Sequence, residues 1–234
     1  MDRERTQQAI DYLAQFVTAQ RQRRIEEALR WRTRHLTVML EDVYQPHNAS
    51  AVLRTCEIFG VQDVHIVERA NKFRPNRDIA LGAPQWLTLH RYRDDEARRG
   101  AEGSGTRRGF RALRRKGYHI AALTLEEDSA PLASLSLEQP LALCFGTEEE
   151  GLSAEAHDLA DSLVHLPMYG FTQSFNISVT VALALQTLIR QLHNSDVDWR
   201  LSQEAQLELK LEWLVQTVPR GDIVLKNYLA QQET

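Results

Sequence analysis

Three stretches of the sequence gather polar side chains of the kinds that bind ligands and assist catalysis. They are EDVYQPHNASAVLRT (residues 41–55), LCFGTEEEGLSAE (residues 143–155) and HLPMYGFTQSFNISVTVALAL (residues 165–185). Each begins in or just after an apolar run typical of a buried strand. Because ligands of open α/β sheets bind at the carboxyl ends of the strands, we expect the three stretches to lie close together.

The first stretch places a proline and an asparagine ahead of a helical apolar pattern. Pro46 holds the loop, and asparagine is a favoured N-cap residue, so we expect Asn48 to cap the helix. Arg54 follows beside the apolar residues Val52 and Leu53. An arginine next to an apolar face usually holds an anion or a carboxylate, so Arg54 is a candidate binding residue. A plain surface charge is the alternative.

The second stretch is a short glycine-bounded turn with three consecutive carboxylates. Gly146 and Gly151 allow a tight turn whose backbone N–H groups face a ligand. Glu148 and its two acidic neighbours would repel a polyphosphate, so the turn favours a cationic or neutral nucleoside. Alternatively, the acidic residues only stabilise the N-terminus of the next helix.

The third stretch concentrates turn residues and polar groups in one loop and helix start. These residues are Pro167, Gly170, Ser174, Asn176 and Ser178. Hydroxyl and amide groups around a kinked backbone offer both donors and acceptors to a ligand. Ser174 and Asn176 are therefore further candidates for the same site.

Strands and helices alternate through the middle of the chain and must position these loops. Strands are expected at residues 36–40, 64–68, 87–92, 119–126, 140–146 and 162–168, and helices at residues 49–59, 107–116, 153–160 and 176–193. This alternation predicts an α/β domain with a parallel sheet covered on both faces. The polar, glycine-rich residues 94–106 are expected to form a flexible loop of unknown role.

The ends of the chain are purely helical in pattern. One or two helices are expected over residues 6–30, with a break around residues 21–24. Further helices are expected after residue 194, interrupted at Pro219. The basic clusters at residues 21–35 and 107–117 each carry an aromatic residue. Either cluster alone fits a solvated helix face equally well, and the presence of two such clusters adds some support for nucleic-acid binding.

Composition indicates a globular protein of the cytoplasm. The formal net charge is −4, and the longest apolar runs are too short to span a bilayer. Residues 1–11 lack the apolar core of a signal peptide. Cys56 and Cys144 lie in apolar runs without CxxC spacing, which indicates buried, reduced thiols.

Taken together, the three stretches resemble the SPOUT superfamily of RNA methyltransferases, specifically its TrmH (SpoU) class of 2′-O-ribose methyltransferases. The resemblance covers residues 36–192, with PHNASAVLRTCEIFGV as motif one, LCFGTEEEGLS as motif two and LPMYGFTQSFNISVTVALAL as motif three. Phe175 replaces the leucine that is more usual beside Asn176. Within the class, EDVYQPHN and the short helical extensions look most like the tRNA enzymes that methylate guanosine(18) of the D loop.

The resemblance implies an α/β fold with a deep C-terminal trefoil knot, a homodimer, S-adenosylmethionine as cofactor and tRNA as substrate. It implies no metal and no membrane association. It also suggests the domain division 1–35 (an RNA-binding helical extension), 36–194 (the methyltransferase domain) and 195–234 (a second helical extension). Three alternatives stay open: an enzyme acting on ribosomal RNA, an inactive RNA-binding member of the class, and a nucleotide-binding α/β domain acting on small molecules.

Residue roles follow from the resemblance by position. The cofactor would contact Leu123, Gly146, Leu166, Met168 and Phe175. The polar positions of the motifs, taken as the catalytic set, are Asn48, Arg54, Glu148, Ser174 and Asn176.

Methyl transfer to a ribose requires the 2′-oxygen to be aligned and made more nucleophilic. Since arginine stays protonated in proteins, we expect Arg54 to hold the adjacent RNA phosphate and polarise the 2′-hydroxyl, with the phosphate or a water accepting the proton. Asn48 is expected to hold Arg54 or its loop, and Asn176 with Ser174 to order the knot loop. Glu148 is expected to orient the motif-two backbone or a partner arginine.

Overall fold

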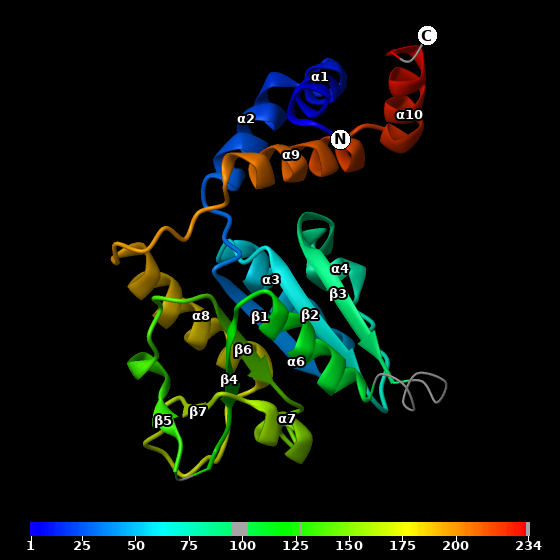
Figure 1. Ribbon diagram of the computed structural model, residues 1–234. Coiled ribbons are helices and arrows are strands. Elements are labelled where there is room, and N and C mark those ends of the chain that lie inside the picture. Colours follow the sequence, from blue (N-terminus) through cyan, green and yellow to red (C-terminus); the bar gives the residue numbers. More distant parts are fainter. Residues whose placement is uncertain (95–102, 127, 233–234) are drawn as a thin grey trace. The chain divides into compact units, whose positions relative to one another are not determined.

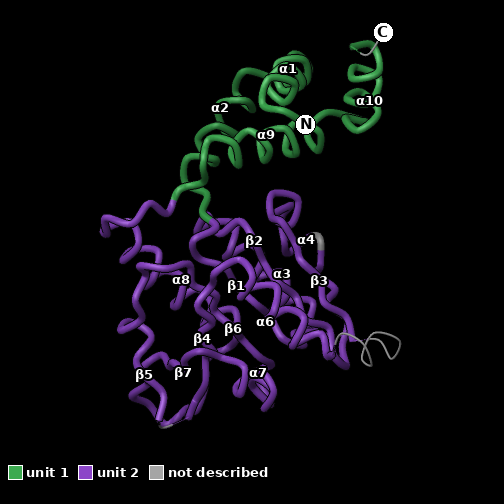
Figure 2. Tube along the Cα trace, viewed as in Figure 1, with its two compact units in different colours: residues 1–33, 200–234 green, residues 34–199 purple. Residues whose placement is uncertain are grey.

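The computed structural model describes residues 1–94, 103–126 and 128–232. Within these ranges the chain forms two compact units (Figures 1 and 2). Residues 34–199 form the larger unit, and residues 1–33 and 200–234 together form the smaller one. Most of the predicted glycine-rich loop, residues 95–102, lies outside the described residues.

The larger unit is built on a seven-stranded parallel sheet of order β3-β2-β1-β6-β4-β7-β5. Its strands are β1 (Leu36–Glu41), β2 (Asp63–Glu68), β3 (Thr88–Arg93), β4 (His119–Leu123), β5 (Ala130–Pro131), β6 (Leu141–Phe145) and β7 (Ser162–His165). The predicted parallel α/β sheet is therefore confirmed. The two-residue strand β5 was not predicted, because two residues show no periodicity.

Helices cover both faces of the sheet, as Figure 1 shows. They are α3 (Pro46–Ile58), α4 (Arg77–Ala80), α6 (Gly105–Arg115), α7 (Ala154–Leu159) and α8 (Ile177–His193), with the 3₁₀ turns η1 (Ala83–Trp86) and η2 (Leu132–Ser134). Helices α3 and α8 pack on one face, and α6 and α7 pack on the other.

Alternation along the central strands produces these two cores. In β6, Leu143 and Phe145 join the core under α3 and α8, whereas Cys144 between them joins the core under α6 and α7. Cys56 and Cys144 are both buried free thiols, as predicted. Burial raises the pKa of the Cys144 thiol well above its usual range, which keeps it protonated.

Two predicted strands end earlier than expected. Strand β4 ends at Leu123 rather than at residue 126, and β7 ends at His165 rather than at residue 168. Pro167 has no N–H with which to continue β7. The residues released from these strand ends line a pocket described below.

The smaller unit contains four helices among the described residues, two from each end of the chain. They are α1 (Arg3–Ala14), α2 (Ala19–Leu29), α9 (Gln203–Thr217) and α10 (Gly221–Gln232). The predicted break at residues 21–24 is wrong. The break lies before Thr18, whose side chain accepts a hydrogen bond from the N–H of Arg21, and the basic residues after it lie on the exposed face of α2.

The two chain ends hold each other in this unit. Helix α1 packs along α9, Arg3 donates to Gln203 Oε1 at 3.2 Å, and Lys210 pairs with Glu26 at 2.8 Å. The rings of Tyr12 and Tyr228 stack with their centroids 4.3 Å apart. No helix of the described chain is both long and apolar enough to pass through a bilayer.

Candidate active site

Glu148 joins the three predicted stretches through a set of hydrogen bonds. Its Oε1 accepts from Asn48 Nδ2 at 3.0 Å, from the backbone N–H of Ile177 at 3.1 Å and from Asn176 Nδ2. Asn176 Nδ2 also donates to Asn48 Oδ1 at 3.1 Å. The predicted convergence of the three loops is therefore confirmed, and a single carboxylate oxygen lies at its centre.

Asn48 does not cap its helix, so that prediction is wrong. Helix α3 begins at Pro46 with Gln45 as the N-cap, which places Asn48 within the first turn. The Asn48 side chain is only 4% exposed and donates to Gln45 Oε1 at 2.8 Å as well as to Glu148. Asparagine here fixes the start of α3 to motif two instead of satisfying a free backbone N–H.

Asn176 is itself the N-cap of α8. Its Oδ1 accepts from the N–H of Ser178 at 2.9 Å and from the Ser178 hydroxyl at 2.6 Å. Both polar atoms of the Asn176 side-chain amide therefore form hydrogen bonds, because Oδ1 caps the helix and Nδ2 donates to Glu148 and Asn48. Glu148 consequently orders motifs one and three, and no described arginine pairs with it.

The motif-two turn is closed by its own backbone. Thr147 and Gly151 exchange two backbone hydrogen bonds of 3.0 and 3.1 Å, and Gly151 has a φ of 69°. A side chain at position 146 would meet the carbonyl oxygen of Gly151 at 1.9 Å, so Gly146 permits the close approach. The tip of this turn presents Glu148, Glu149 and Glu150.

Glu41 binds Ser153, just after the same turn, and was not predicted from the sequence. This buried carboxylate, at the end of β1, accepts from the N–H and hydroxyl of Ser153 at 2.7 and 2.8 Å and from the Thr106 hydroxyl at 2.5 Å. Ser153 is the N-cap of α7. The only signal in the sequence was an acidic residue closing the apolar run LTVML.

A cavity of about 420 Å³ opens at the carboxyl ends of β4, β6 and β7. Its lining includes all five residues predicted to bind the cofactor, namely Leu123, Gly146, Leu166, Met168 and Phe175, and also Glu148 and Ser174. We call it the first pocket. Thr124, Leu125, Glu126 and His157 line it as well and were not predicted, because residues 124–126 were assigned to the strand expected at 119–126, which ends at Leu123.

A second cavity of about 400 Å³ adjoins the first, and we call it the second pocket. Residues 147–150 and Ile177 line both pockets. The remaining lining of the second pocket is formed by Asp42, Val43, Tyr44, Gln45, Asn48, Ala70 and Asn71.

Arg54 is not brought together with the other predicted site residues of its own chain. It lies on the exposed face of α3 and lines neither pocket. Its apolar neighbours Val52 and Leu53 point into the core. Among the described residues, Arg54 has no hydrogen bond or ion pair. Its guanidinium is therefore available to a ligand or to another chain.

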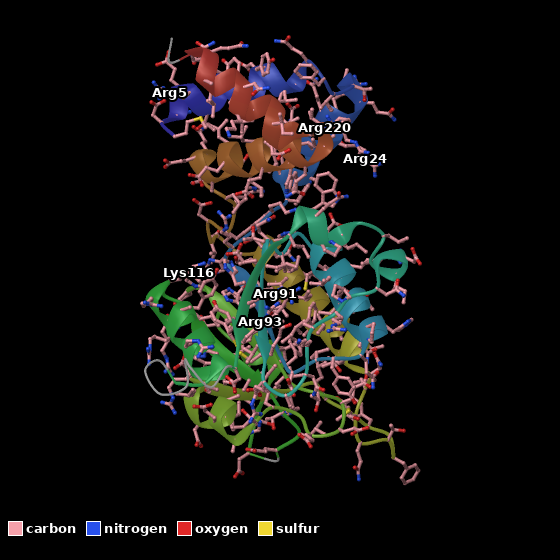
Figure 3. All side chains as sticks on the ribbon, turned by 90° about the vertical axis from the view of Figure 1, so that its right-hand side faces the viewer. Arg5, Arg24, Arg91, Arg93, Lys116 and Arg220 are labelled. Atoms are coloured by element: carbon pink, nitrogen blue, oxygen red, sulfur yellow. The ribbon has the colours of Figure 1, made fainter. Side chains whose placement is uncertain are left out.

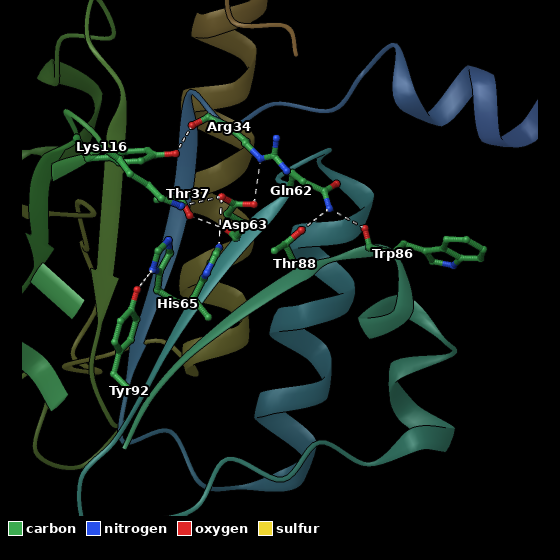
Figure 4. Close-up of polar contacts among 11 residues, drawn as sticks. Arg34, Thr37, Gln62, Asp63, His65, Trp86, Thr88, Tyr92 and Lys116 are labelled. Carbon is green, nitrogen blue, oxygen red and sulfur yellow. Dashed lines mark hydrogen bonds and ion pairs between the residues drawn. The ribbon is translucent and has the colours of Figure 1, made fainter. Parts of the chain in front are cut away.

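A separate buried polar cluster lies at the amino end of β2, away from the pockets (Figure 4). Asp63 lies 3.3 Å from Arg34 Nε, 3.4 Å from His90 Nε2 and 3.7 Å from Lys116 Nζ. Burial raises the pKa of Asp63, but the adjacent His90 ring and the charges of Arg34 and Lys116 outweigh burial and hold the pKa below its usual range.

His65 completes this cluster beside Tyr92. Its Nδ1 lies 2.9 Å from the Tyr92 hydroxyl, and its ring stacks on that of His90. Burial, then the charge of His90, lowers the pKa of His65 to about 3, so the ring is neutral at pH 7. Ligand atoms of Asp63, His65 and His90 lie within 4.8 Å of one another, but Arg34 and Lys116 already balance the carboxylate. The absence of a metal stays a prediction.

Comparison with known proteins identifies the family to which this chain belongs. The model of the SpoU rRNA Methylase family matches residues 35–186. A tRNA (guanosine(18)-2′-O)-methyltransferase of Borreliella burgdorferi is 40% identical over 94% of this chain and 92% of its own length. A protein of the same name from Thermus thermophilus is 35% identical over 84% of this chain and 97% of its own length.

Solved structures agree in fold. The A. aeolicus TrmH/SpoU tRNA modifying enzyme is similar with a TM-score of 0.72 and 27% identity, over 86% of this chain and 98% of that one. The SpoU methyltransferase AviRb from Streptomyces viridochromogenes, solved with AdoMet, shares the fold at a TM-score of 0.56 and 19% identity, over 72% of this chain and 65% of that one. The fold and the pockets thus define a parallel α/β protein of the SpoU type, with two pockets at the carboxyl ends of the strands. The chain belongs to the SpoU rRNA Methylase family.

Proposed function

We propose that this protein transfers the methyl group of S-adenosylmethionine to the ribose 2′-hydroxyl of guanosine(18) in tRNA. The observation that carries the proposal is the 40% identity with the Borreliella burgdorferi tRNA (guanosine(18)-2′-O)-methyltransferase, which spans 94% of this chain and therefore extends into both helical ends. The predicted polar residues Asn48, Glu148 and Asn176 are present and joined by hydrogen bonds, which argues against an inactive member of the family.

The first pocket suits S-adenosylmethionine in both shape and charge. Leu123, Leu166 and Met168 give it apolar walls for an adenine ring, and the turn at Gly146 leaves backbone atoms accessible. The carboxylate of Glu148 at its edge complements a sulfonium cation. When bound there, the cofactor would supply an electrophilic methyl group.

The chain's own residues order the site and hold the RNA. Glu148 fixes the loops of motifs one and three, and Ser174 offers a hydroxyl to the first pocket. The Arg54 guanidinium has no hydrogen bond or ion pair with the described residues, so it is free to hold the RNA phosphate beside the target ribose and polarise the 2′-hydroxyl. The phosphate or a water would then accept the proton.

A second copy of the chain would complete this arrangement. Helices α3 and α8 pack together and expose Ile58, Val179 and Leu183 by 66%, 44% and 40%. Ile58 lies one helical turn from Arg54 on the same face of α3. Burying these apolar residues against the same patch of a second chain would form a symmetric dimer and place the Arg54 of each chain beside the other chain.

The dimer is tested by light scattering on the wild type and on Leu183→Glu. We expect a wild-type dimer and a variant monomer with reduced methyl transfer. Gln231→Glu, which adds the same charge at an exposed position of α10, is the matched control and should remain dimeric. A monomeric wild type with full activity would exclude a shared site.

The two helical extensions, residues 1–35 and 195–234, are proposed to bind tRNA. Exposed arginines of both chain ends support this role, including Arg5, Arg24 and Arg220, which Figure 3 labels. Membership of the family further supports a trefoil knot in the C-terminal part of the larger unit and a cytoplasmic location with the tRNA pool.

Incorporation of tritiated methyl groups tests the activity directly. Unmodified tRNA transcripts should accept methyl groups, and a transcript with adenosine at position 18 should not. Reverse transcription at limiting nucleotide concentration would map the modified ribose. Transfer to ribosomal RNA but not to tRNA would instead identify the ribosomal alternative, and transfer to neither would contradict the proposal.

A further inference from the structure

The second pocket lies where an acceptor nucleotide would enter beside the first pocket. The two cavities share the motif-two tip and Ile177, and Glu148 contributes to the lining of both. Methyl transfer needs the acceptor ribose next to the cofactor, so the nucleotide that carries this ribose must occupy neighbouring space. At about 400 Å³, the second pocket has the size of a small-molecule site.

The free carboxylates of the second pocket indicate which chemical group it binds. Four carboxylates line it, and two of them are already used within the chain. Asp42 Oδ1 accepts from three backbone N–H groups at 2.9 to 3.0 Å, and Glu148 holds the loops of motifs one and three. Glu149 and Glu150 are exposed and, among the described residues, have no side-chain partner. The second pocket therefore presents carboxylate oxygens that receive no hydrogen bond from a described side chain.

Acceptors of this kind exclude some ligands and suit others. A phosphate would be repelled by the two negative charges. A base edge with two adjacent N–H donors would pair with a carboxylate in a bidentate manner, as guanine does through N1–H and the N2 amino group. Adenine and inosine each lack part of this donor pair.

Tyr44 supplies a surface on which a base could stack. Its ring is 42% exposed, lines the second pocket and has no partner among the described residues. The loop that carries it is anchored by Asp42, which adopts the left-handed conformation with a φ of 58° and binds the N–H groups of residues 69–71. Bases taken out of a stack are commonly bound by aromatic stacking together with hydrogen bonds to their Watson–Crick edge.

We propose that the second pocket binds the base of the target guanosine, with Tyr44 against its face and the Glu149–Glu150 pair accepting N1–H and the N2 amino group. The inference rests on the proposed methyl transfer and deepens it, because it assigns the selection of guanosine to this chain's own carboxylates. Glu149 and Glu150 act as specificity-determining residues.

The same two carboxylates also line the first pocket, which defines the competing role. If they served only to neutralise the cofactor, their removal would weaken cofactor binding equally for every acceptor base. If they bind guanine, their removal would alter the preference among bases and leave the KM for the cofactor unchanged. Substrate analogues separate these two outcomes.

The experiment measures kcat/KM for tRNA transcripts that carry guanosine or inosine at the target position, with the wild type and with the double variant Glu149→Gln, Glu150→Gln. Inosine lacks only the N2 amino group. We expect the wild type to prefer guanosine by about tenfold or more, the usual effect of one hydrogen bond to a charged acceptor. In the variant, this ratio should fall several-fold toward one, because a neutral amide oxygen accepts more weakly than a carboxylate, and the KM for S-adenosylmethionine should stay unchanged.

Matched variants complete the design. Glu138→Gln removes an exposed carboxylate outside both pockets and should keep the wild-type ratio. Tyr44→Phe should retain activity because the ring remains, whereas Tyr44→Ala should raise the KM for tRNA about tenfold. Circular dichroism verifies folding of each variant.

Two results would overturn the proposal. One is an unchanged guanosine-to-inosine ratio in the double variant, and the other is a raised KM for the cofactor with no change in that ratio. A wild type that methylates no tRNA would contradict the proposed function itself. In that case, saturation-transfer NMR with free guanosine and inosine would still test the pocket, since guanosine should bind the wild type better than inosine and the double variant should lose this difference.

Discussion

Replacing Asn48 by aspartate tests the hydrogen-bonded centre of the site with almost no change in shape. The amide Nδ2 that donates to Glu148 Oε1 at 3.0 Å and to Gln45 Oε1 at 2.8 Å becomes an acceptor oxygen. Two carboxylates then face each other without a proton between them. The variant Asn48→Asp should therefore be less stable than Asn48→Ala, although alanine removes more atoms.

The magnitude follows from the distance and the exposure of the pair. Two unit charges at 4 Å interact by about 4 kcal/mol at the effective dielectric constant of a protein surface. Glu148 is exposed, so water screens part of this repulsion, and we expect a loss of about 2 kcal/mol at pH 7. The site as a whole should lose cofactor affinity because both partner loops depend on Glu148.

The sign of the pH dependence distinguishes charge repulsion from a packing defect. The new carboxyl would have a pKa above its unfolded value, so its cost is absent at low pH and grows as pH rises. Urea unfolding of the wild type and of Asn48→Asp should therefore nearly coincide at pH 4 and diverge by pH 7. Asn227→Asp on α10, where the asparagine is exposed, is the control and should show no such divergence. A difference that does not change with pH would refute the reasoning.

Three further predictions concern single residues elsewhere. Arg54→Lys should lower methyl transfer about 100-fold but change the unfolding free energy by less than about 0.5 kcal/mol, because Arg54 is exposed and unpaired within its described chain; near-normal turnover would exclude a planar, bidentate role. Gly146→Ala should weaken S-adenosylmethionine binding at least about tenfold in calorimetry, since the added methyl group would meet Gly151 O at 1.9 Å, and unchanged affinity would show that the turn can relax. The pKa of His65 falls from 6.5 to about 3 on folding, so its contribution to stability is complete above pH 6.5 and declines as pH falls toward 3, by up to about 1.4 kcal/mol per pH unit. The variant His65→Asn should flatten this part of the stability curve. An equal slope in both proteins would contradict the lowered pKa.

Local pattern was sufficient to predict the sheet and the convergence of the loops. Apolar runs and their spacing located six of the seven strands, and the rule that ligand loops follow strand ends predicted their meeting. What local pattern could not provide was the partner of each polar side chain. Asn48 had the composition of an N-cap, yet its partners Glu148 and Asn176 lie 100 and 128 residues away.

Arg54 also shows a limit of prediction from local sequence pattern. Its apolar neighbours in the sequence suggested a residue beside the core, but the helix turns Val52 and Leu53 inward and Arg54 outward. A helix of 3.6 residues per turn separates adjacent residues by about 100°, so nearness in sequence is not nearness on one face. The role of Arg54 therefore depends on what contacts that face, and no described residue of this chain pairs with it.

In the smaller unit, the N-terminal helices depend on the C-terminal helices for their packing. Buried residues of α1, including Ile10 and Leu13, pack along α9, whose Leu209 and Trp213 are made about 200 positions later. At about 5 to 20 residues per second, the N-terminal helices wait on the order of 10 to 40 s during synthesis before their apolar partners exist. The larger unit, which needs only residues 34–199, can fold in that interval. A chain that stops before α9 would thus carry a folded sheet and two N-terminal helices with bare apolar faces, a form that protein quality control can recognise and remove.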